Sequence, residues 1–355
     1  MREFRRGNHR YYHATGIMVP GIAGRKITMQ QLLSVPEDRV GRNHHRYSWE
    51  VVGSFIRAEG LDGIELVLGK GRGRLPVPDG LVKTVHLPIW PGWIRPWRDP
   101  QSIPAGHDPA GIAAHYGAPT PEKLMERFCR NLGRAAEYQA AYAVVHASYH
   151  EPEETLAQPG RYRSREILAT VASFANALAS RYPGGEPPVT LAFENHWLSG
   201  LTFLAPGDTE YFAGLLSFDN WIFVLDTGHL MNTLQVRSER KGILDVIRVI
   251  DRLPVAMRQR IRAVHLHCST SGGSQHAESP PLALPGRTSR EARTLADYHR
   301  QIDEHRPFSN PACRKIVAML RPGYLVHEFV ANTPDAMQAA IRQQKALLGD
   351  ARAWP

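Results

Sequence analysis

Most apolar runs in this 355-residue sequence end in a histidine or a carboxylate. Six of eight such runs do so, in the phrases Val85-His86, Val145-His146, Glu194-Asn195-His196, Asp226-Thr227-Gly228-His229, His265-Leu266-His267 and His327-Glu328. Imidazole and carboxylate groups bind divalent transition metals and transfer protons in catalysis. If several of them meet, they repel or lose charge unless a cation neutralises them. The pattern therefore predicts a divalent metal, and the absence of cysteine from these phrases favours manganese, zinc, cobalt or iron over a structural zinc site.

The apolar runs are short, and helical segments separate most of them. The eight runs are residues 14–19, 63–68, 83–88, 142–147, 189–195, 221–226, 261–267 and 324–329. Between them, apolar residues recur at helical spacing, as in the set Leu124, Phe128, Leu132 and the set Ile167, Val171, Phe174, Leu178. Residues 48–59, 243–253, 310–320 and 333–347 are also typical of helices. This alternation predicts βα units and a parallel sheet.

Eight strands alternating with helices favour a single (β/α)8 TIM barrel with inserted loops; the alternative is an open, doubly wound α/β sheet. We expect the barrel to span residues 14–348, between an N-terminal extension of residues 1–13 and a C-terminal tail of residues 349–355. The loop insertions lie near residues 89–118 and 269–294. Active sites of such barrels form where the strands end, so the metal-competent side chains are predicted to meet there.

Composition limits the classes of partner. The chain has 43 Lys+Arg and 34 Asp+Glu, a formal net charge of +9, but its arginines are scattered, which does not favour a nucleic-acid partner. No run approaches 18 apolar residues and the N-terminus is polar, so we expect a cytoplasmic protein without a membrane partner. The spacing of Cys129, Cys268 and Cys313 fits neither a disulfide framework nor a cysteine-rich zinc module.

Four phrases resemble the xylose isomerase-like TIM-barrel superfamily, which groups sugar phosphate isomerases and epimerases with endonuclease IV. They are Asp226-Thr227-Gly228-His229, Val264-His265-Leu266-His267, Asp303-Glu304-His305-Arg306-Pro307-Phe308 and Tyr324-Leu325-Val326-His327-Glu328-Phe329. The resemblance runs from Gly63 to Glu328, apart from the Pro/Trp-rich loop and the inserted loop. Members share the metal site and differ in their loops, so the resemblance indicates the superfamily rather than one reaction. Such barrels often associate, which leaves a homo-oligomer open.

The isomerase and epimerase branch implies four metal ligands, which match Glu194, Asp226, His265 and Glu328. It also implies that Glu194 and Glu328 are the acid and base on opposite faces of the substrate, while the cation polarises a carbonyl and stabilises an enediolate. His229 would contact a substrate oxygen. With Glu194, Glu328 and His229 as catalytic residues, we predict an isomerase or epimerase of a sugar, sugar phosphate or related hydroxy-carbonyl compound.

The endonuclease IV branch holds three zinc ions, and the resemblance implies nine ligands in the same order. These are His86, His146, Glu194, Asp226, His229, His265, Asp303, His305 and Glu328. A phosphodiesterase of the AP endonuclease type is therefore an alternative, and one to three ions are expected. The Pro/Trp-rich loop at residues 87–97 and the insertion at 269–294 depart from that branch on the substrate side. A multinuclear iron enzyme that modifies a peptide or small molecule, and a non-catalytic ligand-binding barrel, are further alternatives.

Four more side chains are predicted to contact a small-molecule substrate, namely His196, His267, Trp90 and Trp93. Alternation along a strand places His265 and His267 on one face, so one would bind metal while the other orients it or contacts substrate. The tryptophans would stack on a sugar face or a base, and the alternative is that they pack their loop onto the barrel. Glu328 is predicted to point into the barrel and His327 away from it.

Overall fold

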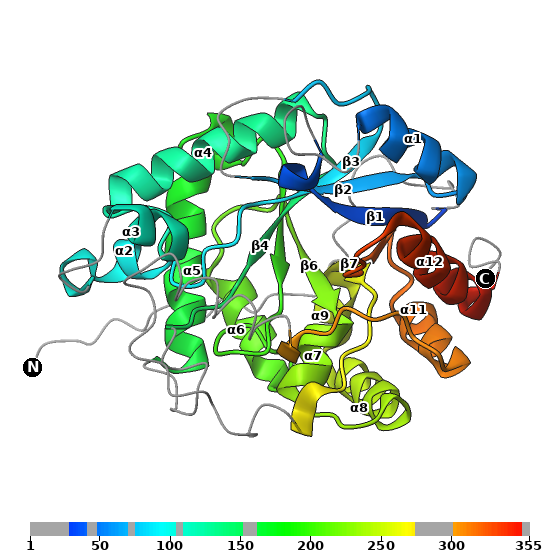
Figure 1. The fold of residues 1–355 in the computed structure, drawn as a ribbon. Coiled ribbons are helices and arrows are strands. Elements are labelled where there is room, and N and C mark those ends of the chain that lie inside the picture. The colour runs from blue at the N-terminus through cyan, green and yellow to red at the C-terminus, as the bar shows by residue number, and fades with distance from the viewer. Residues whose placement is uncertain are drawn as a thin grey trace, which may run out of the picture.

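Short apolar runs form the eight strands of a closed parallel barrel, ringed by helices (Figure 1). The computed structural model describes residues 28–40, 48–69, 75–103, 109–151, 162–273 and 301–349. The strands are β1 (Gln30–Pro36), β2 (Gly63–Val67), β3 (Val82–His86), β4 (Tyr142–His146), β5 (Thr190–Glu194), β6 (Trp221–Asp226), β7 (Ile261–His265) and β8 (Tyr324–His327). Each strand pairs with the next, and β8 pairs with β1. The predicted (β/α)8 barrel is confirmed.

The first strand is a correction to the sequence-based prediction. We expected it at residues 14–19, which lie outside the described residues, whereas the barrel uses Gln30–Pro36. Leu33 of β1 lies opposite Ile64 of β2 on one side and His327 of β8 on the other. Periodicity cannot distinguish two short aliphatic runs, because the choice depends on which one pairs with both edges of the sheet. The other seven strands lie within two residues of their predicted ends.

Helices cover the outside of the barrel. They are α1 (Trp49–Ala58), α2 (Arg95–Arg98), α3 (Pro109–His115), α4 (Pro121–Glu137), α5 (Ser164–Ala179), α6 (Pro206–Leu215), α7 (Thr227–Thr233), α8 (Glu239–Arg252), α9 (Val255–Arg260), α11 (Arg314–Leu320) and α12 (Pro334–Leu348). The apolar faces predicted for α4 and α5 are buried, including Phe128 and Phe174. No described helix is long and apolar enough to cross a membrane.

The interior of the barrel changes from apolar to polar along the strands. A separate apolar cluster fills it at one level, formed by Tyr142, Val144, Ala192, Val224 and Ala263. Because side chains on one face of a strand recur every second residue, the next interior position on each strand lies two residues further on. Those positions are His146, Glu194, Asp226 and His265, so the pleat itself brings the predicted ligands to one end of the barrel.

Candidate metal centre

The first group of candidate ligands lies at the ends of β3, β4 and β5. His86 Nε2 is 3.3 Å from His146 Nε2 and 3.2 Å from Glu194 Oε2, and His146 Nε2 is 3.3 Å from the same oxygen. His86 Nδ1 lies 2.7 Å from the carbonyl oxygen of Leu87. A carbonyl only accepts, so Nδ1 donates, and in the neutral ring Nε2 turns a lone pair toward the other two residues. Three ligand atoms thus face one point.

The second group lies in the middle of the barrel mouth. His265 Nδ1 is 3.3 Å from Glu194 Oε1, 3.8 Å from Asp226 Oδ2 and 2.9 Å from Glu328 Oε2. These four residues offer ligand atoms that all lie within 4.8 Å of one another. Asp226 is held by further contacts, since its Oδ1 accepts a hydrogen bond from the backbone N–H of His229 at 2.6 Å and caps α7. The strand-to-helix turn therefore fixes this carboxylate.

The third group joins α7 to the segment that precedes α11. His229 Nε2 and His305 Nε2 each lie 3.1 Å from Asp303 Oδ2. His229 Nδ1 lies 2.9 Å from the carbonyl oxygen of Asn195, so Nδ1 donates, and in the neutral ring Nε2 faces the Asp303 carboxylate with its lone pair. A lone pair and a carboxylate repel unless a proton or a cation lies between them. The other oxygen of Asp303 accepts from the Asn232 amide at 3.3 Å.

Several buried polar atoms in these groups have no hydrogen-bond partner among the described residues. They are His265 Nδ1, His265 Nε2, His305 Nε2, His267 Nδ1 and Glu328 Oε2. Unsatisfied buried polar atoms are rare in proteins, and a metal ion between such atoms would satisfy them. His265 Nδ1 and Glu328 Oε2 lie 2.9 Å apart in the second group and His305 Nε2 lies in the third, whereas His265 Nε2 faces Glu65. The imidazole and carboxylate donor set suits a divalent transition metal. The residues present therefore fit the ions that the sequence predicts.

The charges of the centre attract one another strongly. Burial would raise the pKa of the Glu194 carboxyl, but His265 and His146 hold that pKa well below its usual range. Burial would lower the pKa of His265, but the carboxylates of Glu65, Glu194 and Glu328 raise it well above its usual range. Both shifts have one physical cause, which is that each carboxylate in this buried cluster gains from a nearby positive charge. Cations bound between the same atoms would supply that charge.

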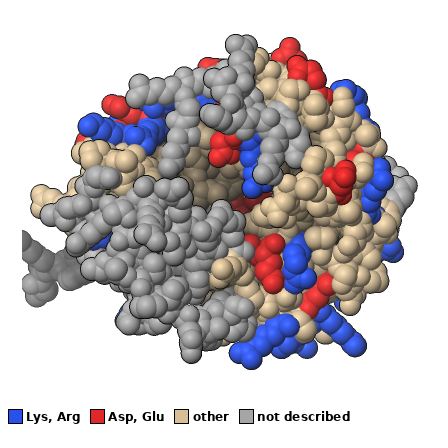
Figure 2. Space-filling view, viewed as in Figure 1, with Lys and Arg blue, Asp and Glu red and all other residues tan. Residues whose placement is uncertain are grey.

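A cavity of about 180 Å³ opens above the groups, within a face that is hollowed near its centre (Figure 2). His196, Trp90 and Trp93, predicted to contact substrate, line this cavity together with His146 and Glu328. His267 does not line it. Its Nε2 lies 2.9 Å from Asp226 Oδ2, so it sits behind a candidate ligand.

The loop tryptophans pack their own segment onto the barrel as well as lining the cavity. Trp93 lies 5.3 Å from Phe128 of α4 and 5.1 Å from Phe174 of α5 between ring centroids, and Trp90 lies 5.6 Å from Phe128. Trp93 Nε1 donates to the carbonyl oxygen of His146 at 3.2 Å. Both tryptophans are buried. The packing alternative considered for them is therefore present in the structure.

Known proteins resemble this chain in fold and not in sequence. No protein-family model matches the sequence, and no curated protein matches it at a significant level. Among solved structures, L-ribulose 3-epimerase is similar over 89% of this chain and 93% of its own, with 13% identity and a TM-score of 0.51. The structure described as AsfvAP:AG is similar over 91% and 100%, with 11% identity and a TM-score of 0.51. Endonuclease IV from Thermus thermophilus is similar over 90% and 98%, with 16% identity and a TM-score of 0.49.

The chain has the xylose isomerase-like TIM-barrel fold. The resemblance read from the strand-end phrases is thereby confirmed at the level of the fold. Within this xylose isomerase-like barrel, the nine residues predicted from the endonuclease IV branch make up three of the four possible metal-binding groups among the described residues. The remaining group, His267, His305 and Glu328, shares two residues with them.

Sequence reasoning missed Glu65 as a site residue. Glu65 lies on β2 and is fully buried, and its Oε1 is 3.0 Å from His265 Nε2, while Oε2 accepts from the Thr84 hydroxyl at 3.0 Å. A carboxylate behind a ligand histidine orients the ring and raises its basicity. The signal in the sequence was a lone acidic residue inside an apolar strand. His327, in contrast, lies apart from the ligand groups as predicted, with Nε2 3.1 Å from Gln31 Oε1.

Proposed function

We propose that this chain is a divalent-metal enzyme that holds three ions at the mouth of its barrel and uses them to hydrolyse a small ester-like substrate. One observation carries the proposal. Nine buried or half-buried residues form three groups whose ligand atoms each lie within 4.8 Å, and Glu194 belongs to two of them. Glu194 would therefore help to hold two neighbouring ions, whereas a single ion would leave two groups of facing donors without a charge between them.

The chain's own residues have distinct tasks in this proposal. His86, His146 and Glu194 would hold one ion, Glu194, Asp226, His265 and Glu328 a second, and His229, Asp303 and His305 a third. Glu65 orients His265, and His267 orients Asp226. Bound ions of this kind lower the pKa of water and stabilise a departing oxyanion.

Proton transfer to the leaving group then falls to a side chain outside the three groups. His196 lines the mouth cavity and stacks on Trp197 with ring centroids 3.9 Å apart. Its ring centroid lies 4.9 Å from that of His229, so it reaches the edge of the third group. We therefore assign His196 the role of contacting the substrate and moving the proton.

The isomerase or epimerase predicted from the sequence becomes the second candidate, and one observation favours it. Glu194 and Glu328 approach the same His265 nitrogen, at 3.3 and 2.9 Å, so both can face a substrate carbonyl held at the second group. In that reaction the two glutamates would exchange protons with carbon, and His229 would contact a substrate oxygen. The L-ribulose 3-epimerase neighbour is compatible with this alternative but shares only the fold.

A small molecule fits this site better than duplex nucleic acid. The mouth cavity measures about 180 Å³, and the Pro/Trp-rich loop packs on α4 and α5 at its edge. On the face shown in Figure 2, described Lys and Arg side chains are interspersed with Asp and Glu and form no continuous basic stripe. Duplex binding depends on such stripes, because neutralising phosphates supplies most of its affinity.

Metal analysis by mass spectrometry tests the proposal first. The protein is purified without chelators or metal-affinity resin, and metal is reported as equivalents per chain. We expect close to three equivalents. One equivalent would favour the isomerase, and none would overturn metal catalysis altogether.

Two assays then separate the reactions on the metal-loaded protein. Hydrolysis of p-nitrophenyl phosphate esters and carboxylic esters reports the proposed chemistry. Exchange of carbon-bound hydrogen in ketoses dissolved in D2O, followed by NMR, reports the isomerase chemistry. Exchange without any hydrolysis would replace the first proposal with the second.

A further inference from the structure

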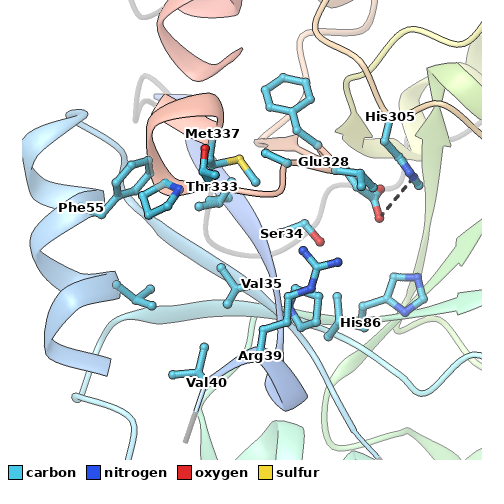
Figure 3. Close-up of a pocket in the computed structure, with 18 of the residues that line it drawn as sticks. Ser34, Val35, Arg39, Val40, Phe55, His86, His305, Glu328, Thr333 and Met337 are labelled. Atoms are coloured by element: carbon cyan, nitrogen blue, oxygen red, sulfur yellow. Dashed lines mark ion pairs between the residues drawn. The ribbon is translucent and has the colours of Figure 1, made fainter. Parts of the chain in front are cut away.

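A second cavity, of about 280 Å³, lies beside the metal centre between β1, α1 and α12 (Figure 3). The segment after β8, residues 328–334, forms one wall of it, and Leu33 to Pro36 of β1 lie at its floor. We call it the β1 pocket. No role has been assigned to it in the proposed hydrolysis, and the nine candidate ligands contribute only His86, His305 and Glu328 to its lining.

Apart from that corner, the β1 pocket is lined mostly by apolar side chains. They include Val35, Val40, Val52, Phe55, Phe329 and Met337. Large apolar side chains are also exposed at this pocket, since Val51 is 53% exposed, Ile89 51% and Val330 45%. Exposed apolar residues are ordinary when scattered, but a group of them around one cavity marks a binding site. The apolar lining of the β1 pocket therefore favours an apolar ligand.

The β1 pocket is continuous with the catalytic mouth. His86, Ile89, His305 and Glu328 line both the β1 pocket and the mouth cavity. The metal centre therefore lies at the junction of two spaces, one apolar and one rich in histidine. A molecule whose reacting bond is at the junction must extend into at least one of them.

One arginine, Arg39, lines the β1 pocket. Arg39 is exposed and makes no ion pair with any residue in the described parts of the chain. In Figure 3 its guanidinium points toward Ser34, between the apolar wall and the corner formed by His86 and Glu328. A guanidinium so placed suits a carboxylate or phosphate, which it can bind with two parallel hydrogen bonds.

We propose that the substrate is an amphiphilic anion whose apolar arm binds in the β1 pocket, with its negative group near Arg39 and its reacting bond at the metal centre. This inference rests on the proposed metal-dependent function. The apolar wall supplies affinity in proportion to the hydrocarbon it covers, while Arg39 and the bound ions fix the polar end. Compact sugars, which lack such an arm, would leave the β1 pocket empty.

Calorimetric titration with linear alkyl carboxylates, from acetate to decanoate, tests the inference on the metal-loaded full-length chain. Each added methylene should tighten binding about fourfold until the pocket is full. Val51→Asp should flatten this dependence, because it sets a charge at the apolar edge. Val255→Asp is the matched control, since Val255 is 59% exposed on α9 and does not line the β1 pocket. Ala331→Trp, which fills the pocket, is a second variant and should weaken only the long acids.

Arg39→Gln separates the charge from the apolar arm. It should weaken every acid by the same severalfold factor and leave the dependence on chain length unchanged. Equal affinity of Arg39→Gln and wild type would remove Arg39 from the site. If affinity did not change with the chain length of the acid, a result called a flat series below, in wild-type protein that holds its ions, the inference would be overturned. A flat series together with a lower melting temperature of Val51→Asp would show that the chain itself fills the pocket, and loss of a dimer in that variant would assign the pocket to a second copy.

Metal content of the same samples distinguishes this inference from the proposed function. A steep series in protein that holds no metal would overturn the metal-dependent function and leave the apolar site. A flat series in protein with three ions would overturn the substrate class and leave the function.

Discussion

His265 Nδ1 lies 2.9 Å from Glu328 Oε2, yet neither atom makes a hydrogen bond in the described parts of the chain. In the neutral ring, with the Nε2 proton directed at Glu65 Oε1, both atoms are acceptors that face the same space, and His265 is fully buried. Such an arrangement is costly unless a cation lies between the atoms, because burial removes the water that would otherwise solvate them. This pair is therefore the clearest place in the described residues where a metal ion could be held.

Variants at Glu194 and Asp303 should lose different numbers of ions. Glu194 belongs to two groups and Asp303 to one of the three proposed sites. By mass spectrometry, we expect the metal content to fall from three equivalents per chain to one in Glu194→Gln, and from three to two in Asp303→Asn. Asp245→Asn is the control, because Asp245 pairs with Lys241 and Arg248 on α8. Three equivalents in both site variants would contradict the assignment.

Glu65 should raise the affinity for the metal without being a ligand itself. Its carboxylate contacts the far nitrogen of His265, so Glu65→Gln should weaken the tightest metal site about 10- to 100-fold in chelator competition. Glu59→Gln is the matched control. Glu59 is also buried, but it pairs with Arg342 of α12 and belongs to none of the ligand groups. Unchanged metal affinity in Glu65→Gln would show that His265 needs no such support.

Gly228 should tolerate no side chain. A Cβ atom there would lie 2.0 Å from His267 Cε1, and His267 contacts Asp226. Gly228→Ala should therefore displace the His267 ring and lower the metal content of the second group. Gly133→Ala in α4 is the control, because its Cβ would meet nothing within 4 Å, and it should raise the free energy of unfolding by up to about 1 kcal/mol. Normal metal loading in Gly228→Ala would show that His267 has no part in holding Asp226.

A buried ion pair should stabilise the Pro/Trp-rich loop. Arg95 Nη1 pairs with Glu151, whose Oε2 also accepts from the Tyr116 hydroxyl at 3.0 Å. Glu151→Leu leaves the buried Arg95 without its partner and should lower the free energy of unfolding by about 3–5 kcal/mol in urea titrations. Arg98 and Glu166 form an exposed pair nearby, so Glu166→Gln should cost less than about 1 kcal/mol. Equal losses in the two variants would contradict the structural role of Glu151.

The Glu151 carboxyl should make the free energy of unfolding depend on pH. Burial would raise the pKa of Glu151, but His115, Tyr149 and Arg95 lower it from 4.5 to about 2. A lowered pKa means that the unfolded chain binds the proton more readily, so this stabilisation is complete above about pH 4.5 and is lost as the pH falls toward 2. The difference in unfolding free energy between wild type and Glu151→Leu should shrink over that range. A constant difference would show that Glu151 does not titrate on unfolding.

The sequence alone was sufficient for the barrel and for the identity of the candidate ligands. Seven strands and the buried faces of α4 and α5 follow from local periodicity, which a strand or helix cannot change without exposing its apolar side. Val144 and His146 are two residues apart on one strand, as are Ala192 and Glu194. Residues two apart lie on the same face, so an apolar residue inside the barrel predicts that the polar residue after it also points inside. Residues 14–19 were mistaken for the first strand because pairing with β8 is a property of the closed barrel.

Tertiary structure alone decided how those residues combine. Closure of the barrel sets β2 and β7 so that Glu65 reaches His265, a contact between residues 200 positions apart that no local pattern reveals. It also divides nine residues into three groups with Glu194 shared, and places His267 behind Asp226 instead of in the mouth. The β1 pocket likewise exists only because α1 and α12, near opposite ends of the chain, pack over the same strand. Local sequence determines which way a side chain faces, but only the packing of distant segments determines which side chain it meets.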